Sequence, residues 1–251
     1  MKILITGGTG YLGSNFSLLC NEFKTSHSIL NLLQVKDANL KEFDVIIDFA
    51  MIDRRVVTWL KDDVETFIRN HNSLLDKILE LKKKYIRVSS IFDVRSFIRD
   101  DSYTNLSRKI SKTVLKRIPN STVIYSHAVY GGLNSKSFID LKIGKSLIFQ
   151  ESIRDYIHIR DLGEVMLTFL SNYKQLDREI ELGTGKPYLT SEIMKAKELG
   201  GFKQLTPIDF DSSNFNSLSK KNLVCSASQP KEQNFSTVLL DDKLVQYLLK
   251  A

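Results

Sequence analysis

Short runs of apolar, β-branched residues alternate with amphipathic stretches along the first half of the chain. The run at 2–6 (KILIT) is followed at once by glycines, as expected of a buried parallel strand that enters a tight turn. Over residues 12–23 the apolar side chains recur every three or four positions, which predicts a helix with one face packed on a sheet. This change of period from segment to segment continues to residue 130.

Strands and helices are therefore expected to alternate along this half. Such alternation predicts an α/β fold, a doubly wound Rossmann sheet of parallel strands with helices on both faces and right-handed crossovers. The further strands are expected at 27–33, 45–49, 85–90 and 122–130, and the further helices at about 56–84 and 104–117.

The pattern loosens after residue 132. A helix is expected at 160–171 and a short strand at 179–182. Residues 205–234 are rich in Ser, Asn, Asp, Lys and Gln and predict loops, and a last amphipathic helix is expected at 241–249.

Composition restricts the class of protein and its partners. The chain has 251 residues, of which 42% are hydrophobic and 26% charged, values typical of a soluble globular protein with a sizeable core. Its formal net charge of +7 comes from scattered lysines without an interleaved aromatic stripe, so we expect no nucleic-acid partner. A positive field instead suits ligands that carry phosphates.

Cysteine and histidine usage argues against a metal centre. The two cysteines, Cys20 and Cys225, lie far apart without a disulfide or metal-binding spacing, and the four histidines show no mutual metal spacing. We therefore expect no metal and a reducing, cytoplasmic location. The N-terminal apolar stretch is too short for a signal peptide or a membrane span, so no membrane association is expected.

The segment TGGTGYLG places three glycines between the first strand and the first helix. Gly7 suits the tight turn, Gly10 leaves room for a pyrophosphate to approach the backbone, and Gly13 lets the helix lie close to the strand. The first turn of the helix, with Tyr11 and Leu12, then offers backbone N–H groups to the anion. The spacing predicts a dinucleotide site, and the alternative is a purely structural turn.

The phosphate state of the dinucleotide stays open. Dinucleotide folds carry an acid about 20 residues after the glycines for an NAD ribose, or a basic residue for a 2′-phosphate. Here Glu22, Lys24, His27 and Asn31 occupy that region, and the pattern places none of them at the end of a strand. The expected cofactor is therefore NAD or NADP.

Further segments along the chain carry recognisable motifs. They are FDVIIDFA at 43–50, RVSS at 87–90, HAVYGG at 127–132, RDYIHIRDLGEV at 154–165 and ELGTGKPYLTSEI at 181–193. Together with the glycine segment, and in this order, they resemble the extended short-chain dehydrogenase/reductase family, the nucleotide-sugar epimerases, dehydratases and ketoreductases. The motif at 154–165 is the most specific, although we expect a mainly structural role for its charged side chains.

This resemblance implies an NAD(P)-dependent enzyme that modifies a nucleotide-diphosphate sugar by hydride transfer, in 4-keto reduction, epimerisation or dehydration. Such an enzyme would serve surface polysaccharide or deoxysugar biosynthesis. The resemblance also implies a homodimer formed through the helices near 63–84 and 104–117. The implied domains are a dinucleotide-binding domain of residues 1–132 and about 154–185, and a small substrate-binding domain of residues 133–153 and 186–251.

Position within the family's motifs implies further cofactor contacts at Asp48, Ala50 and Ala128. Asp48 stands where the family often has histidine, and Ala128 stands where asparagine is common. A buried Asp48 at a strand end would need hydrogen-bond partners, so a satisfied structural carboxylate is the alternative.

The family's catalytic residues are a Ser or Thr, followed by Tyr and Lys four positions apart on one helix, where the lysine lowers the tyrosine pKa. Ser90 matches the hydroxyl, and Tyr103 and Lys109 are the expected partners, with Lys109 also expected to hold the nicotinamide ribose. Tyr103 and Lys109 are six positions apart, so they do not share a face of a continuous helix. They converge only if Tyr103 lies before the helix.

Three alternatives follow from this departure. Tyr103 works from a shifted backbone, another group supplies the proton, or the function of the tyrosine is lost. In the last case the chain would be a non-catalytic scaffold or sensor that binds a dinucleotide.

Overall fold

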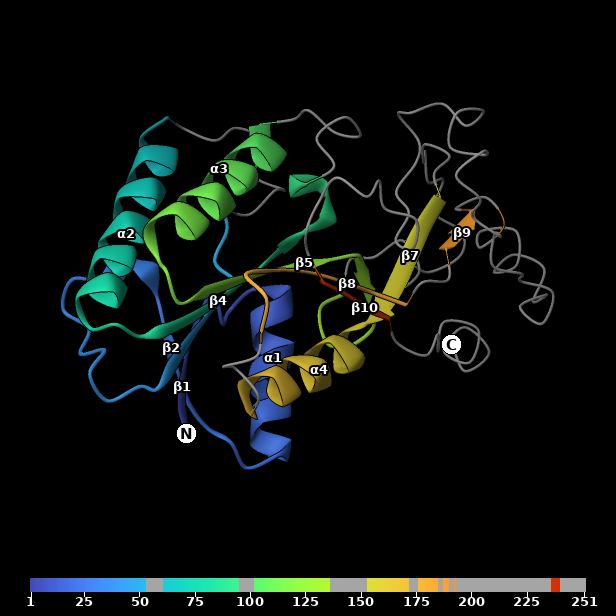
Figure 1. The fold of residues 1–251 in the computed structure, drawn as a ribbon, viewed down its shortest axis with the longest axis horizontal. Coiled ribbons are helices and arrows are strands. Elements are labelled where there is room, and N and C mark those ends of the chain that lie inside the picture. Colours follow the sequence, from blue (N-terminus) through green and yellow to red (C-terminus); the bar gives the residue numbers. More distant parts are fainter. Residues whose placement is uncertain are drawn as a thin grey trace.

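The computed structural model consists of a parallel sheet between two layers of helices, with a second, smaller sheet beside it (Figure 1). It describes residues 1–52, 61–94, 102–135, 153–171, 176–184, 187–189, 192 and 236–239. The strands are β1 (Lys2–Thr6), β2 (Ser26–Leu30), β3 (Val45–Asp48), β4 (Lys84–Ser90), β5 (Ser121–Ser126), β6 (Ala128–Tyr130), β7 (Ile153–His158), β8 (Glu179–Gly183), β9 (Pro187–Leu189) and β10 (Ser236–Leu239). The helices are α1 (Tyr11–Glu22), α2 (Lys61–Glu80), α3 (Ser102–Arg117) and α4 (Ile159–Ser171), and the short 3₁₀ turns are η1 (Leu32–Gln34) and η2 (Ile91–Asp93).

The main sheet has the strand order β10-β8-β5-β4-β3-β1-β2, and all its neighbouring strands are parallel. The smaller sheet has the order β6-β7-β9, with β6 parallel and β9 antiparallel to β7. The chain reverses its direction across the main sheet after β2, because β3 pairs with the other edge of β1. Ligands of open parallel sheets bind at such a switch point, outside the carboxyl ends of the strands.

Both faces of the main sheet are apolar, because helices cover both. Ile3 and Ile5 of β1 belong to the core cluster that includes side chains of α1 and α4. Leu4, which points the other way, belongs to the cluster that includes side chains of α2 and α3. Figure 1 shows the two helix pairs on opposite sides of the strands. The predicted α/β fold, a doubly wound Rossmann sheet, is confirmed.

The strand predicted at 122–130 is in fact two strands that belong to different sheets. It breaks at His127, which is buried between β5 and β6 with its Nε2 atom 2.5 Å from Oε1 of Glu181 on β8. This side-chain contact holds the end of β5 against β8 while the following residues leave for the smaller sheet. β-branched and aromatic residues stand on both sides of the break without a glycine or proline between them, so the sequence does not mark it.

The strand predicted at 27–33 ends earlier, at Leu30. The Asn31 side chain accepts a hydrogen bond from the backbone N–H of Leu33 at 3.0 Å and begins η1, so a local turn replaces the sheet ladder. The helix predicted at 56–84 is described from Lys61 and ends at Glu80, since Lys82 takes a left-handed φ of +51°. The loops predicted at 205–234 and the helix predicted at 241–249 lie outside the described residues, and the pattern does not predict β10.

A carboxylate lies buried at the carboxyl end of β3. The side chain of Asp48 is fully buried, and its Oδ1 atom accepts hydrogen bonds from the Thr6 hydroxyl at 2.6 Å and the Ala50 backbone N–H at 2.8 Å. The Oδ2 atom accepts hydrogen bonds from the Tyr85 hydroxyl at 2.5 Å and the Arg87 guanidinium at 2.7 Å. His71 Nε2 of α2 lies 3.0 Å from the same oxygen. One side chain thus joins β1, β3, β4 and α2.

This carboxylate is charged because its partners outweigh its burial. Burial alone would raise the pKa of Asp48, but the Arg87 guanidinium and the His71 imidazole hold that pKa well below its usual value. Arg87 is itself only 1% exposed, so Asp48 and Arg87 neutralise each other inside the protein. A buried ion pair of this kind adds little stability compared with an apolar pair. Removing one partner, however, leaves the other charge buried without a counter-charge, which is strongly destabilising.

The substitution Arg87→Met should therefore lower the free energy of unfolding by roughly 3–5 kcal/mol, because it leaves the Asp48 carboxylate buried without its cation. Urea unfolding at neutral pH measures the loss. Arg160→Met is the matched control, since it removes exposed ion pairs with Glu22 and Glu164 and should cost less than about 1 kcal/mol. Equal losses in the two variants would contradict this account.

Candidate functional site

The glycine loop follows β1 at the carboxyl edge of the main sheet. Gly7 has a φ of +69°, and a Cβ atom there would lie 2.6 Å from the backbone nitrogen of Ala50. A Cβ atom on Gly13 would lie 2.4 Å from the carbonyl oxygen of Gly7. These two positions must be glycine for the chain to fold into this loop.

Gly10 differs from the other two glycines. A Cβ atom at this position would meet only the Gly7 carbonyl oxygen, at 3.3 Å, and the backbone angles of φ −77° and ψ 171° are open to any residue. Gly10 is the N-cap of α1, with no side-chain capping hydrogen bond, and the first turn of α1 holds no acid. This end of α1 therefore suits an anion such as a pyrophosphate, as predicted for Gly7, Gly10 and Gly13.

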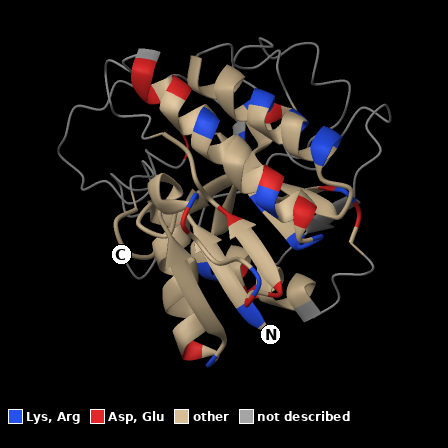
Figure 2. Cartoon of the chain, turned by 90° about the vertical axis from the view of Figure 1, so that its left-hand side faces the viewer, with Lys and Arg blue, Asp and Glu red and all other residues tan. Residues whose placement is uncertain are grey.

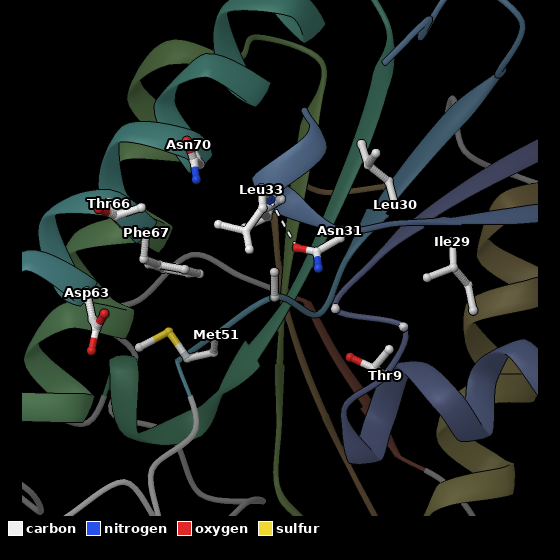
Figure 3. A pocket seen from close by; sticks show the side chains of 14 residues that line it. Thr9, Ile29, Leu30, Asn31, Leu33, Met51, Asp63, Thr66, Phe67 and Asn70 are labelled. Carbon is white, nitrogen blue, oxygen red and sulfur yellow. Dashed lines mark hydrogen bonds between the residues drawn. The ribbon is translucent and has the colours of Figure 1, made fainter. Parts of the chain in front are cut away.

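A cavity of about 300 Å³ opens beside this loop (Figure 3). It lies between the ends of β1, β2 and β3 on one side and α2 on the other, so it occupies the switch point of the sheet. Among the residues predicted for the cofactor, Gly7 and Ala50 line it. The other lining residues are Gly8, Thr9, Ile29, Leu30, Asn31, Leu32, Leu33, Met51, Asp63, Thr66, Phe67 and Asn70.

None of the remaining predicted cofactor residues lines the cavity. Asp48 is buried beneath the loop, which favours the alternative of a satisfied structural carboxylate. Tyr11 donates its hydroxyl to the Gly131 carbonyl at 2.7 Å, and Leu12 packs against the core. Ala128 is half-buried at the start of β6.

Asn31 lines the cavity, although the sequence pattern did not place it at the end of a strand. It follows β2 directly, at the position where dinucleotide folds carry the residue that contacts the adenine ribose. The predicted strand 27–33 put it inside a strand. The residue type was an available signal for the end of β2, because asparagine often begins turns, as Asn31 does here at the start of η1.

Ser90 ends β4 at the same edge of the sheet. Its hydroxyl oxygen accepts a hydrogen bond from the Phe92 backbone N–H at 3.3 Å, and its side chain is half-buried. The neighbouring Ser89 points into the protein and donates to Asp93 at 2.5 Å. Of the two serines in the motif, Ser90 is the more accessible, as expected for the predicted catalytic hydroxyl.

The structure does not bring Tyr103 and Lys109 together. Their convergence required Tyr103 to precede the helix, but α3 begins at Ser102 and includes both residues. Six positions on a continuous helix turn through about 240°, so the two side chains leave on different faces. Lys109 is exposed in an outer groove of α3 with Arg108 and Lys112.

Ser107 stands four positions after Tyr103, where the family's lysine would be, and it is buried. Its hydroxyl donates to Asp93 Oδ2 at 3.0 Å, and so does that of Ser111, one turn later, at 2.9 Å. Ser89 Oγ lies 3.0 Å from Ser107 Oγ, and Arg87 Nε donates to Ser111 Oγ at 3.4 Å. The lysine position thus belongs to a buried polar cluster that joins β4, η2 and α3.

Asp93 is the acid of this cluster and is 4% exposed. Burial raises the pKa of its carboxyl, although the hydroxyls of Ser89 and Ser111 act to lower it. All the hydrogen bonds that reach Asp93 from Ser89, Ser107 and Ser111 end on Oδ2, and Oδ1 has no partner among the described residues. The carboxyl is therefore held in place through one oxygen, and its pKa lies above the usual value because it is buried.

The motif at 154–165 makes structural contacts. Asp155 is buried and accepts a hydrogen bond from the Thr184 hydroxyl, which ties β7 to the end of β8. The His158 ring packs edge-on against Tyr130. Arg160 pairs with Glu22 of α1, an exposed contact between α4 and α1.

The described part of the chain contains neither a candidate metal site nor a candidate membrane-spanning helix. No group of histidine, cysteine and acidic side chains there has the arrangement of a metal site. Among the helices that the structure describes, none combines the length and apolar character needed to cross a bilayer.

Comparison with known proteins supports the fold. No protein-family model and no curated protein sequence matches the chain. A UDP-galactose 4-epimerase matches in structure with a TM-score of 0.62 and 14% identity, covering 98% of this chain and 91% of that one. ADP-L-glycero-D-manno-heptose-6-epimerase of Helicobacter pylori matches with a TM-score of 0.62 and 18% identity, covering 79% and 82%. A dTDP-4-dehydrorhamnose reductase from Clostridium acetobutylicum matches with 0.60 and 15%, covering 100% and 92%.

The resemblance drawn from the motifs is thus confirmed at the level of the fold. The chain shares its fold with these two epimerases and this reductase over most of their length. In the smaller sheet, β6 and most of β7 fall in the predicted dinucleotide-binding domain and β9 falls in the predicted second domain, so the division into these two domains stays a prediction. Most of residues 133–153 and 186–251 lie outside the described residues.

Asp93 should make the stability of the protein depend on pH. Because its pKa is raised on folding, its contribution is fully present below the unfolded value, about 3.9, and is lost as pH rises through the folded pKa. The stability of the wild-type protein relative to Asp93→Asn should therefore fall as the pH rises above about 4. Urea unfolding across this range measures the difference. Exposed Asp37, changed to Asn, is the control, and a wild-type to Asp93→Asn difference that stays constant would refute this assignment.

Proposed function

We propose that the chain binds a nicotinamide dinucleotide, with the pyrophosphate on the glycine loop and the adenosine in the neighbouring cavity. The uncapped N-terminus of α1 carries the proposal, because it presents backbone N–H groups beside Gly10 with no side chain in the way. The cavity between β2 and α2 continues from that loop and is lined mainly by apolar side chains, as suits a purine.

We further propose that the bound dinucleotide serves hydride transfer on a nucleotide-diphosphate sugar. The structural neighbours support this class of reaction, since they are named as epimerases and reductases of such sugars. When bound, the nicotinamide would give or take the hydride. Ser90, at the carboxyl end of β4, would hold the sugar hydroxyl or ketone by a hydrogen bond, and residues 133–153 and 186–251 would grip the nucleotide.

The group that moves the proton is part of the proposal. Tyr103 lies in the first turn of α3, at the end of the helix nearest the carboxyl edge of β4, but Ser107 replaces the lysine that would lower its pKa. A phenol without that cation is less ionised at neutral pH, so catalysis through Tyr103 would be slow or would have a higher pH optimum. The alternative is that another group supplies the proton, and the turnover of Tyr103→Phe distinguishes the two.

A second candidate function is that of a dinucleotide-binding scaffold or sensor without catalysis. The burial of Ser107 in the Asp93 cluster and the outward position of Lys109 favour it, because neither can assist Tyr103. In this case the cavity and the glycine loop would be used for binding alone. The two candidates share the cofactor and differ in turnover.

We also propose that the chain forms a homodimer through α2 and α3 and that it is cytoplasmic. Its pathway would be the polysaccharide or deoxysugar biosynthesis that the resemblance implies. The outer groove of α3 carries Arg108, Lys109, Lys112 and Lys116, whereas that of α2 includes the acids Glu65 and Asp76 together with Arg69. Figure 2 shows acidic and basic residues mixed along the helices. In a twofold arrangement these grooves can face each other with opposite charge. Cys20 is a free thiol, as suits a reducing compartment.

Binding of NADH should depend on the space above Gly10. The substitution Gly10→Ala suits the local backbone, so it should change the free energy of unfolding by less than about 1 kcal/mol. It should weaken NADH binding by roughly tenfold or more, because the added methyl group stands where the pyrophosphate approaches. Titration followed by NADH fluorescence measures both proteins, with Leu18→Ala on the exposed side of α1 as control. Absence of binding by the wild-type protein would remove the proposed function.

Turnover separates the two candidate functions. Purified protein is incubated with NAD(P)H or NAD(P) and UDP-glucose, UDP-galactose, dTDP-glucose or a dTDP-4-keto sugar, and products are followed by mass spectrometry. If the chain is an enzyme, Ser90→Ala should lower kcat by roughly 100-fold and leave NADH binding unchanged. Tyr103→Phe should lower kcat as strongly if the phenol moves the proton, and an unchanged rate would exclude it. Tight NADH binding without turnover of any of these sugars would support the scaffold.

A further inference from the structure

The adenosine end of the cavity lacks the usual acid that follows β2. Asn31 holds this position, and its side-chain oxygen is engaged by the Leu33 N–H at 3.0 Å, so its neutral amide group faces the cavity side of η1 (Figure 3). A neutral amide can bond a ribose hydroxyl, but it carries no charge to repel a 2′-phosphate. Any preference for NAD(H) over NADP(H) must therefore come from other residues of the cavity.

Apolar side chains flank Asn31 on the same wall. Ile29 is 50% exposed and Leu33 is 69% exposed, which is unusual for side chains of this size beside a cavity. Ile29 also packs on Gly8, where a Cβ atom would lie 2.7 Å from its Cγ2 atom. These surfaces suit the flat face of a purine and place its ribose near Asn31.

The opposite wall of the cavity is formed by α2 and carries an acid. Asp63, in the first turn of α2, is exposed and is the one charged side chain among the described residues that line the cavity. Figure 3 shows Asp63 on the α2 side of the cavity, near Thr66 and Phe67. In a cavity of about 300 Å³, bound groups lie within about 10 Å of this wall, the Debye length at 0.1 M salt.

We propose that the cavity selects the unphosphorylated cofactor, NAD(H), and that Asp63 on α2 supplies the negative charge that disfavours NADP(H). The inference rests on the proposed dinucleotide function. A 2′-phosphate adds up to about two negative charges to the ligand. Asp63 repels them across the cavity, and the neutral Asn31 amide leaves the ribose hydroxyls of NAD(H) a hydrogen-bond partner. The acid of the proposed adenosine subsite thus lies at the start of α2 and not at the end of β2.

Two arginines offer the strongest opposition to this proposal. Arg54 and Arg55 follow Met51, a lining residue, within a few positions of the sequence and lie outside the described residues. A guanidinium that reached the cavity would pair with a 2′-phosphate and reverse the preference. The experiment therefore includes the double variant Arg54→Gln/Arg55→Gln.

The test compares the dissociation constants of NADH and NADPH by fluorescence titration of the full chain at 0.1 M salt. The wild-type protein should bind NADH about tenfold more tightly than NADPH. Asp63→Asn should reduce this ratio roughly three- to tenfold by tightening NADPH, as expected of one exposed carboxylate acting on a doubly charged group. Asp62→Asn is the matched control, since Asp62 is exposed in the same turn of α2 but does not line the cavity, and it should change the ratio less.

The outcomes separate this proposal from the one on which it rests. If neither NADH nor NADPH binds, the dinucleotide function itself fails. If NADPH binds as tightly as NADH or more tightly, or if Asp63→Asn leaves the ratio unchanged, the cofactor selection is overturned while the function stands. A wild-type preference for NADPH that Arg54→Gln/Arg55→Gln abolishes would assign the selection to the arginines instead.

Discussion

The carboxylate of Asp48, buried at the end of β3, is the interaction on which the rest of the site depends. It bonds the Thr6 hydroxyl, just before the glycine loop, and the Ala50 N–H, against which Gly7 turns. Arg87 supplies its counter-charge from β4. A charge can stay inside a sheet only when its partners are fixed in place, so the same bonds that satisfy Asp48 also fix the position of the loop.

The buried network continues from Asp48 to the edge where the chemistry would occur. Arg87 reaches Ser111 of α3, and Ser111 shares the carboxyl of Asp93 with Ser89 and Ser107. Two carboxyl groups therefore lie near one guanidinium, and burial raises the pKa of Asp93. Ser107, four positions after Tyr103, belongs to this buried cluster through its hydrogen bond to Asp93.

Local signals in the sequence were enough to predict the fold and the loop. The strand before Gly7, the helix after it and the spacing of the glycines all depend on neighbours in the chain, and each is confirmed by the structure. What failed depends on contacts between distant residues. The break at His127 is set by Glu181 on another strand, and the burial of Ser107 is set by Asp93, so period and propensity cannot show either. Asn31 was missed because an apolar run continued past the strand end.

The central proposal is that the buried Asp48 carboxylate shapes the glycine loop, whose backbone would hold the pyrophosphate of the coenzyme. A crystal structure of the chain with NADH tests this directly. We expect electron density for the pyrophosphate over the amides next to Gly10, with the adenosine between β2 and α2 and the hydrogen bonds of Asp48 unchanged. A coenzyme bound elsewhere, or an empty loop at saturating NADH, would contradict it.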